Sequence, residues 1–138
     1  MILMLIGCWS SFRYIEGDHA LSCLQDKVNP ATPQMAQKYA AYPIEHFVVQ
    51  AEKYRPDAAV IKMYAGDWYL RNNDFISAEK AFWKALELDP VRPGAYARLA
   101  KIALLRGDKA KAEELMLKAH SLFPKSRHYK LEKLYGDD

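Results

Sequence analysis

A histidine and a cysteine near the start of the chain have the types and the spacing that metal or thiol chemistry requires. His19 and Cys23 are four residues apart, a spacing that places both side chains on one face of a helix. Such a pair needs a third ligand to hold a metal ion, and a cysteine is reactive only where its thiolate is stabilised. The sequence offers no third ligand at a matching spacing. It therefore favours simple packing of Cys23, and we expect neither a metal nor a cofactor.

Cys8 is the second candidate for covalent chemistry. It follows the apolar run Met1–Ile6, and the tetrapeptide Leu5–Cys8 is similar to a lipobox, in which a bacterial signal peptidase cuts before a cysteine that then carries a lipid. The seven residues ahead of Cys8 are too few for that processing, unless Met1 is an internal methionine of a longer reading frame. In an oxidising compartment Cys8 would instead form a disulfide with Cys23, and the two modifications exclude each other.

The apolar segment at residues 1–16 has three interpretations. It is the lipid anchor described above, the remnant of a transmembrane helix with Trp9, Arg13 and Tyr14 at the interface, or a buried cap on the domain that follows. Its uncharged part is shorter than the roughly 20 residues that a spanning helix requires. In the first two interpretations the repeats face an extracytoplasmic compartment, so the sequence favours the bacterial cell envelope over the cytoplasm.

Catalytic motifs and a strong net charge are both missing from the sequence. It contains no Gly-x-Ser-x-Gly elbow, no glycine-rich phosphate loop and no His-Glu-x-x-His helix. Its 20 basic and 17 acidic residues are interspersed and leave a net charge of only +3, which does not indicate nucleic acid binding. At 138 residues, 51% of them hydrophobic, the chain is long enough for one domain. We therefore expect a non-catalytic domain that binds no nucleic acid.

The chain is organised by a pattern that is written twice with a 34-residue period. The repeated positions are Asn73/Gly107, Asp74/Asp108, Ala78/Ala112, Glu79/Glu113, Lys84/Lys118, Ala85/Ala119, Leu88/Leu122 and Pro90/Pro124. In each copy, two apolar stripes with helical spacing flank a polar break. Small residues of the pattern mark places where two helices approach closely, and Pro90 and Pro124 end each second helix. The period therefore predicts two helix hairpins.

The repeated residues resemble those of tetratricopeptide repeats. The glycine, tyrosine, alanine, aromatic, alanine and proline of that motif are matched in the first copy by Gly66, Tyr69, Ala78, Phe82, Ala85 and Pro90. The second copy keeps most of them, at Ala100, Gly107, Ala112, Ala119 and Pro124. Lys62 and Tyr96 replace the usual tryptophan of the first helix, and Ala103 replaces the tyrosine in the second copy. The resemblance implies an all-α fold, a right-handed α-solenoid of antiparallel helix hairpins.

The tetratricopeptide-like domain implied by this resemblance covers residues 17–138. Its parts are a degenerate repeat, two full repeats and a capping helix, at residues 33–56, 59–92, 93–126 and 127–135. The degenerate repeat rests on Pro56, which lies one period before Pro90, and Pro33 starts its short first helix. Ser126 caps the last helix, which gives the solenoid the polar end that it needs for solubility.

The resemblance also implies a concave groove lined by the first helix of each hairpin. The residues that it places there are Met63, Tyr64, Asp67, Leu70, Arg71, Arg98, Lys101 and Leu105. Apolar side chains beside Arg71, Arg98 and Lys101 suit a protein or peptide partner with an acidic side chain or a terminal carboxylate. A solvated face with buried leucines is the alternative interpretation. Asp67 stands where family members that clamp chaperone tails have asparagine, so chaperone tails are disfavoured as partners.

Two functions follow from the resemblance. One is a protein–protein interaction scaffold that is tethered at the bacterial envelope, similar to tetratricopeptide lipoproteins, and that binds a partner peptide or helix in the groove. The alternative is the soluble repeat tail of a larger membrane-embedded enzyme, because the segment Trp9–Tyr14, which runs into helical repeats, is similar to the tails of O-antigen polymerases and ligases.

Overall fold

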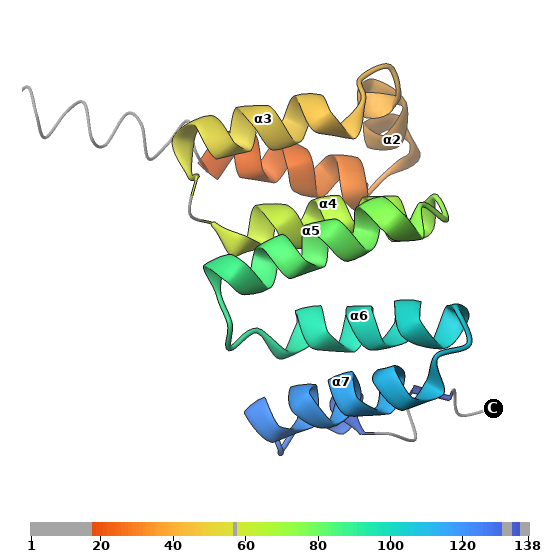
Figure 1. Cartoon of the computed structure of the whole chain (residues 1–138). Coiled ribbons are helices and arrows are strands. Elements are labelled where there is room, and N and C mark those ends of the chain that lie inside the picture. Colours follow the sequence, from red (N-terminus) through yellow and green to blue (C-terminus); the bar gives the residue numbers. More distant parts are fainter. Residues whose placement is uncertain (1–17, 57, 131–133, 136–138) are drawn as a thin grey trace, which may run out of the picture.

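The computed structural model describes residues 18–56, 58–130 and 134–135, and in these residues the chain forms helices and turns without a β-strand. A helix at residues 18–28 comes first. The elements that follow are α2 (Pro33–Ala40), α3 (Ile44–Tyr54), α4 (Ala59–Arg71), α5 (Phe75–Leu88), α6 (Pro93–Leu105), α7 (Lys109–Leu122) and the 3₁₀ turn η1 (Arg127–Tyr129). The fold is all-α, with α3 to α7 stacked in chain order (Figure 1). No helix in the described part of the chain has the length and apolar character needed to span a membrane.

The period of the sequence appears in the structure as two matching helix hairpins. Both ends of α6 and of α7 fall one period after the corresponding ends of α4 and α5. The first helix of each hairpin has 13 residues and the second has 14. The two helices of each hairpin run antiparallel (Figure 1). The structure therefore contains, in each copy of the repeat, the two helices that the apolar stripes predict.

The turn between the helices of a hairpin is repeated as well. Asn73 and Gly107 have positive φ angles of 59° and 85°, a left-handed conformation that glycine and asparagine adopt most readily. The next residue, Asp74 or Asp108, caps the second helix by accepting a hydrogen bond from a backbone N–H three residues later, at 3.0 Å and 3.1 Å. Hydrogen bonds from Ser77 lower the pKa of the Asp74 carboxyl. The Asn/Gly-Asp pair therefore fixes where each hairpin reverses.

A seam of small residues lets the two helices of each hairpin approach closely. Its completely buried members are Ala78, Ala85, Ala100, Ala112 and Ala119. Phe82 fills the space against Gly66 in the first hairpin, and Met116 is buried at the equivalent position of the second. The close approach that the repeated small residues predict is therefore present in both hairpins.

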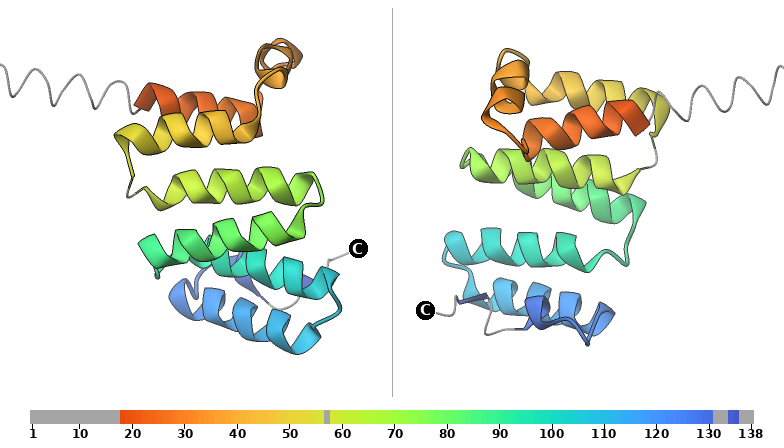
Figure 2. Two further views of the ribbon diagram at one scale, coloured as in Figure 1. Left: turned by 45° about the horizontal axis from the view of Figure 1, so that its top comes forward. Right: turned by 180° about the vertical axis from the view of Figure 1, so that it is seen from behind.

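The helix that lies beside α3 is not the one expected from the degenerate repeat at 33–56. The helix at 18–28 takes this place in both views of Figure 2. Its Leu24 and Val28 are buried in one core cluster with side chains of α3 and α4. By contrast, α2 has eight residues and buries only Tyr39, so it is too short to cover α3. The pattern of prolines correctly predicted α2 and α3, but the packing partner of α3 comes from earlier in the chain.

Lys27 joins the helix at 18–28 to two of its neighbours. Its Nζ donates a hydrogen bond to the carbonyl oxygen of Tyr39 at 2.7 Å and lies 4.6 Å from the centroid of the Trp68 ring. The side chain is buried, and this burial lowers its pKa below the ordinary value of a lysine. Lys27 therefore connects the helix at 18–28 to both α2 and α4.

In the described part of the capping helix predicted at 127–135, residues Arg127–Tyr129 form the 3₁₀ turn η1, and Leu134 also has 3₁₀ conformation. Ser126 begins this turn by accepting a hydrogen bond from the N–H of His128 at 3.2 Å, but the backbone of Lys130 is already extended. Leu134 is buried against the core of α4 to α7. The predicted segment at residues 1–16 and its Cys8 lie outside the described residues.

Candidate functional site

A cavity of about 390 Å³ lies between α4 and α6, beside the turn that follows α4. Its lining residues are Asp67, Leu70, Arg71, Asn73, Phe75, Arg98, Lys101 and Leu105. Six of them are among the eight groove residues predicted from the sequence. The other two, Asn73 and Phe75, come from the turn and from the start of α5. We call this hollow the α4–α6 cavity.

Arg98 and Asp67 form a two-point ion pair between α6 and α4. Arg98 Nη2 donates to Asp67 Oδ2 at 2.9 Å, and Arg98 Nε donates to Asp67 Oδ1. The remaining nitrogen, Nη1, donates to the carbonyl oxygen of Gly94 at 3.1 Å. Because every nitrogen of its guanidinium already donates within the protein, Arg98 fixes α6 against α4 instead of offering a free cation to a ligand.

Arg71 also has internal partners. Its Nη1 donates to the carbonyl oxygen of Val28, and its Nη2 donates to Asn29 Oδ1. Val28 is the last residue of the helix at 18–28, so its carbonyl is one of those that a helix leaves without an internal partner. Arg71 therefore holds the end of that helix against α4 while it lines the cavity.

Lys101 is the remaining cation of the α4–α6 cavity. It is exposed, and it has neither a hydrogen-bond partner nor an ion-pair partner among the described residues. Leu105 lies one turn further along α6 and is 57% exposed, while Leu70 and Phe75 are partly buried against the core. The cavity thus presents an ammonium group beside apolar side chains.

Two of the predicted groove residues do not line the cavity. Met63 is 7% exposed and belongs to the core of α4 to α7, because α6 approaches α4 closely at Gly94, where an added Cβ would lie 3.8 Å from Met63 Cε. Tyr64 packs against the cluster formed by the helix at 18–28 and α3. These two side chains hold helices together instead of facing the cavity.

The predicted pair of His19 and Cys23 does share one helix face. Cys23 Sγ lies 3.8 Å from His19 Nε2, and the Tyr39 hydroxyl lies 3.9 Å from the same sulfur. In the described part of the chain, no three His, Cys, Asp or Glu side chains come together in a way that suits a metal ion. The Cys23 side chain therefore packs between the helix at 18–28 and α2.

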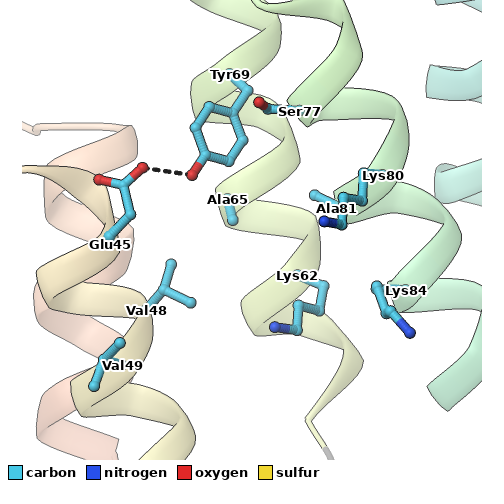
Figure 3. Close-up of a pocket in the computed structure, with 10 residues that line it drawn as sticks. All are labelled: Glu45, Val48, Val49, Lys62, Ala65, Tyr69, Ser77, Lys80, Ala81 and Lys84. Atoms are coloured by element: carbon cyan, nitrogen blue, oxygen red, sulfur yellow. Dashed lines mark hydrogen bonds between the residues drawn. The ribbon is translucent and has the colours of Figure 1, made fainter.

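A second hollow, lined by none of the predicted groove residues, lies between α3, α4 and α5 and has a volume of about 330 Å³ (Figure 3). Its charged lining residues are Glu45, Lys62, Lys80 and Lys84. Its uncharged lining residues are Val48, Val49, Ala65, Tyr69, Ser77 and Ala81. We call it the basic cleft. A signal was present in the sequence, because Ala65 and Ala81 stand one period before the bulkier Leu99 and Leu115.

Tyr69 and Glu45 close one end of the basic cleft. The Tyr69 hydroxyl donates a hydrogen bond to Glu45 Oε1 at 2.6 Å (Figure 3). Burial of Tyr69, together with this bond and the charge of Glu45, raises the pKa of the phenol to about 12. The hydroxyl is therefore protonated at neutral pH, and it keeps the Glu45 carboxylate engaged.

Replacing Tyr69 by phenylalanine should change how stability depends on alkaline pH. The folded-state pKa of about 12 lies above the ordinary value of 10.0, so the stabilisation by this hydroxyl is complete below pH 10 and is lost as the pH rises towards 12. We expect Tyr69→Phe to be less stable than the parent at about pH 8, and the difference to shrink at about pH 11, in urea unfolding. Tyr42→Phe is the control, because Tyr42 is 51% exposed. A pH-independent difference for Tyr69→Phe would contradict this assignment.

Comparisons with known proteins add no relative. A scan against protein-family models finds no match, and a search among curated proteins finds none either.

Proposed function

We propose that the chain is a non-catalytic, tetratricopeptide-like scaffold, a right-handed α-solenoid that binds a partner peptide or helix in the α4–α6 cavity. The fold part of this proposal is supported by the two hairpins, whose helix ends are all related by the same shift along the chain. It is supported further by the same turn and the same N-cap in each. A segment at residues 1–16 that tethers the scaffold at a membrane belongs to the same proposal.

The observation that carries the binding proposal is the lining of the α4–α6 cavity. Leu70, Phe75 and Leu105 offer apolar surface, and Lys101 offers an ammonium group that has no partner among the described residues. An aliphatic or aromatic side chain next to a carboxylate satisfies both features at once. The ligand class that fits is therefore a short segment with an apolar residue and an acidic residue or a terminal carboxylate.

Peptide display on the full chain tests this proposal. We expect the selected peptides to share an apolar residue with a nearby carboxylate. We also expect them not to bind Leu105→Asp, because this substitution places a charge in the apolar lining of the cavity. Leu117→Asp is the matched control, because Leu117 on α7 is 53% exposed against 57% for Leu105 and does not line the cavity. Selected peptides that bind Leu105→Asp as well as the parent would remove the α4–α6 cavity as the binding site.

A further inference from the structure

The repeat period lets one junction between hairpins be compared with the next. The basic cleft lies where α3 and α5 meet across α4. The equivalent place one repeat later is bordered by α5, α6 and α7, because each of these helices ends one period after α3, α4 or α5. There, Leu99 and Leu115 are buried, 2% and 7% exposed. In the basic cleft the same two positions are Ala65 and Ala81, and the side chains that fill the second junction are therefore missing from the first.

Other side chains strengthen the contrast between the two junctions. Val48 and Val49 of the cleft correspond to the larger Phe82 and Trp83, one period later. Phe82 is completely buried, whereas Val48 is only partly buried, and Trp83 is 40% exposed against 62% for Val49. Protein interiors are normally packed to crystal-like density. An apolar hollow that the chain fills in one repeat and leaves open in the other is thus available for an external side chain.

Positive charge also distinguishes the basic cleft. Lys62 and Lys80 are replaced by Tyr96 and Glu114 at the next junction, while Lys84 has a lysine at both. Lys62 pairs with Glu52, and Lys84 pairs with Glu87 at 2.6 Å in an exposed i,i+3 contact, a kind of pair that contributes little.

Lys80 is the cation of the basic cleft that remains available. It is exposed, without an ion-pair partner among the described residues. The one acidic lining residue, Glu45, is held by the Tyr69 hydroxyl. The cleft therefore presents to a ligand the ammonium group of Lys80 beside an apolar floor.

We propose that the basic cleft is a second docking site, which takes an acidic segment of a partner protein. One aliphatic side chain of that segment inserts over Ala65 and Ala81, and a neighbouring carboxylate lies against Lys80. A protein segment fits better than an anionic membrane surface, because the apolar floor is recessed between three helices (Figure 3) and a flat bilayer does not reach into it. It also fits better than nucleic acid, because the Glu45 carboxylate at one end repels a continuous chain of phosphates.

This site is separate from the α4–α6 cavity and does not depend on it. On α4, the cleft is lined by Lys62, Ala65 and Tyr69, which recur at helical spacing along one stripe. The cavity is lined by Asp67, Leu70 and Arg71, which lie on another side of the same helix. One partner can therefore occupy the cleft while another occupies the cavity.

Methyl-resolved NMR of the full chain tests the proposal, with the hexapeptide acetyl-Glu-Asp-Leu-Asp-Glu-Gly-amide as the probe. We expect saturable shifts of the methyl groups of Val48, Val49 and Ala65, and smaller effects when serine replaces the leucine or lysines replace the acidic residues. Ala81→Leu, which copies Leu115 of the next repeat, should weaken binding about tenfold by filling the apolar seat. Lys80→Glu should weaken it several-fold with the packing unchanged, so the proposal stays testable if Ala81→Leu folds poorly.

Three outcomes would overturn the proposal. The first is the absence of saturable shifts at the cleft methyl groups, or shifts that are equal in both variants and the parent. The second is that vesicles of phosphatidylglycerol and phosphatidylcholine shift the same methyl groups while the peptide does not, which would make the cleft a lipid-facing surface. The third is that only Leu70 and Leu105 respond to the peptide. That result would leave the proposed function of the α4–α6 cavity standing while it removes this second site.

Discussion

Gly66→Ala is expected to lower the free energy of unfolding by about 1–2 kcal/mol. A Cβ at this position would lie 2.7 Å from Cδ1 and Cζ of the Phe82 ring, and Phe82 is completely buried, so the ring has little room to move. Overpacking of this kind costs about 1–3 kcal/mol. Alanine returns up to about 1 kcal/mol, because it is a better helix former than glycine. Chemical unfolding monitored by circular dichroism measures the net loss.

The second hairpin supplies the compensating change for Gly66→Ala. It carries Ala100 and Met116 where the first carries Gly66 and Phe82, so Phe82→Met in the Gly66→Ala background reproduces a pair that the chain already packs. The two substitutions together should cost about 1 kcal/mol less than the sum of the single costs. Additive costs in this cycle would mean that the alanine does not contact the ring.

Gly94→Ala is the control for glycine replacement as such. Gly94 also lies in a helix, but a Cβ there would meet Arg98 Nη1 at 3.2 Å, a milder overlap that a small shift of the guanidinium relieves while its hydrogen bonds to Asp67 are kept. We expect the free energy of unfolding of Gly94→Ala to equal that of the parent or to be slightly higher. A loss at Gly94 as large as the loss at Gly66 would attribute the effect to the backbone and not to Phe82.

The helices were predictable from the sequence wherever local signals and the period agree. Asp74 and Asp108, in the polar breaks of the two copies, cap α5 and α7, and Thr32 caps α2 by accepting a hydrogen bond from the N–H of Met35 at 3.2 Å. Caps, prolines and turn residues act on their immediate neighbours in the chain. A single sequence therefore contains enough information to place them.

Packing between distant parts of the chain was less predictable. The helix at 18–28 lies beside α3 because Leu24 and Val28 carry its apolar face, but nothing in the repeated pattern links this segment to α3. At the C-terminus, Ser126 and the residues after it begin a turn that the sequence cannot distinguish from a longer helix. Tertiary contacts decide both outcomes, and local propensity does not report them.

In the candidate site as well, the sequence indicates which residues lie near one another but not which of them form hydrogen bonds. The resemblance placed Lys101 and Leu105 in a groove with residues of α4, and both line the α4–α6 cavity. It did not predict that Asp67 would take up the guanidinium of Arg98, a contact between residues 31 positions apart. The type of side chain at a groove position was readable from the sequence, whereas the availability of that side chain depends on its partners in the folded chain.

Lys101→Glu is expected to weaken binding of a carboxylate ligand in the α4–α6 cavity by about tenfold. An exposed ion pair contributes up to about 1 kcal/mol, and reversing the charge replaces that attraction with a repulsion of similar size. Since every tenfold change in affinity corresponds to about 1.4 kcal/mol, the two effects together reach that range. Lys101 is the better position to test than Arg98, because Arg98→Glu would place a second carboxylate beside Asp67 and disturb the contact between α4 and α6. Titration calorimetry with a selected peptide measures the change.

Lys118→Glu makes the same charge change at an exposed position on α7 that does not line the cavity. It should leave affinity nearly unchanged and so separates a local contact from the effect of net charge. A peptide with lysine in place of its acidic residue should prefer Lys101→Glu to the parent, because the interacting charges are then exchanged and not merely removed. Equal weakening by Lys101→Glu and Lys118→Glu would show that the ligand responds to the overall charge of the protein, and the assignment of Lys101 as the carboxylate-binding residue would be wrong.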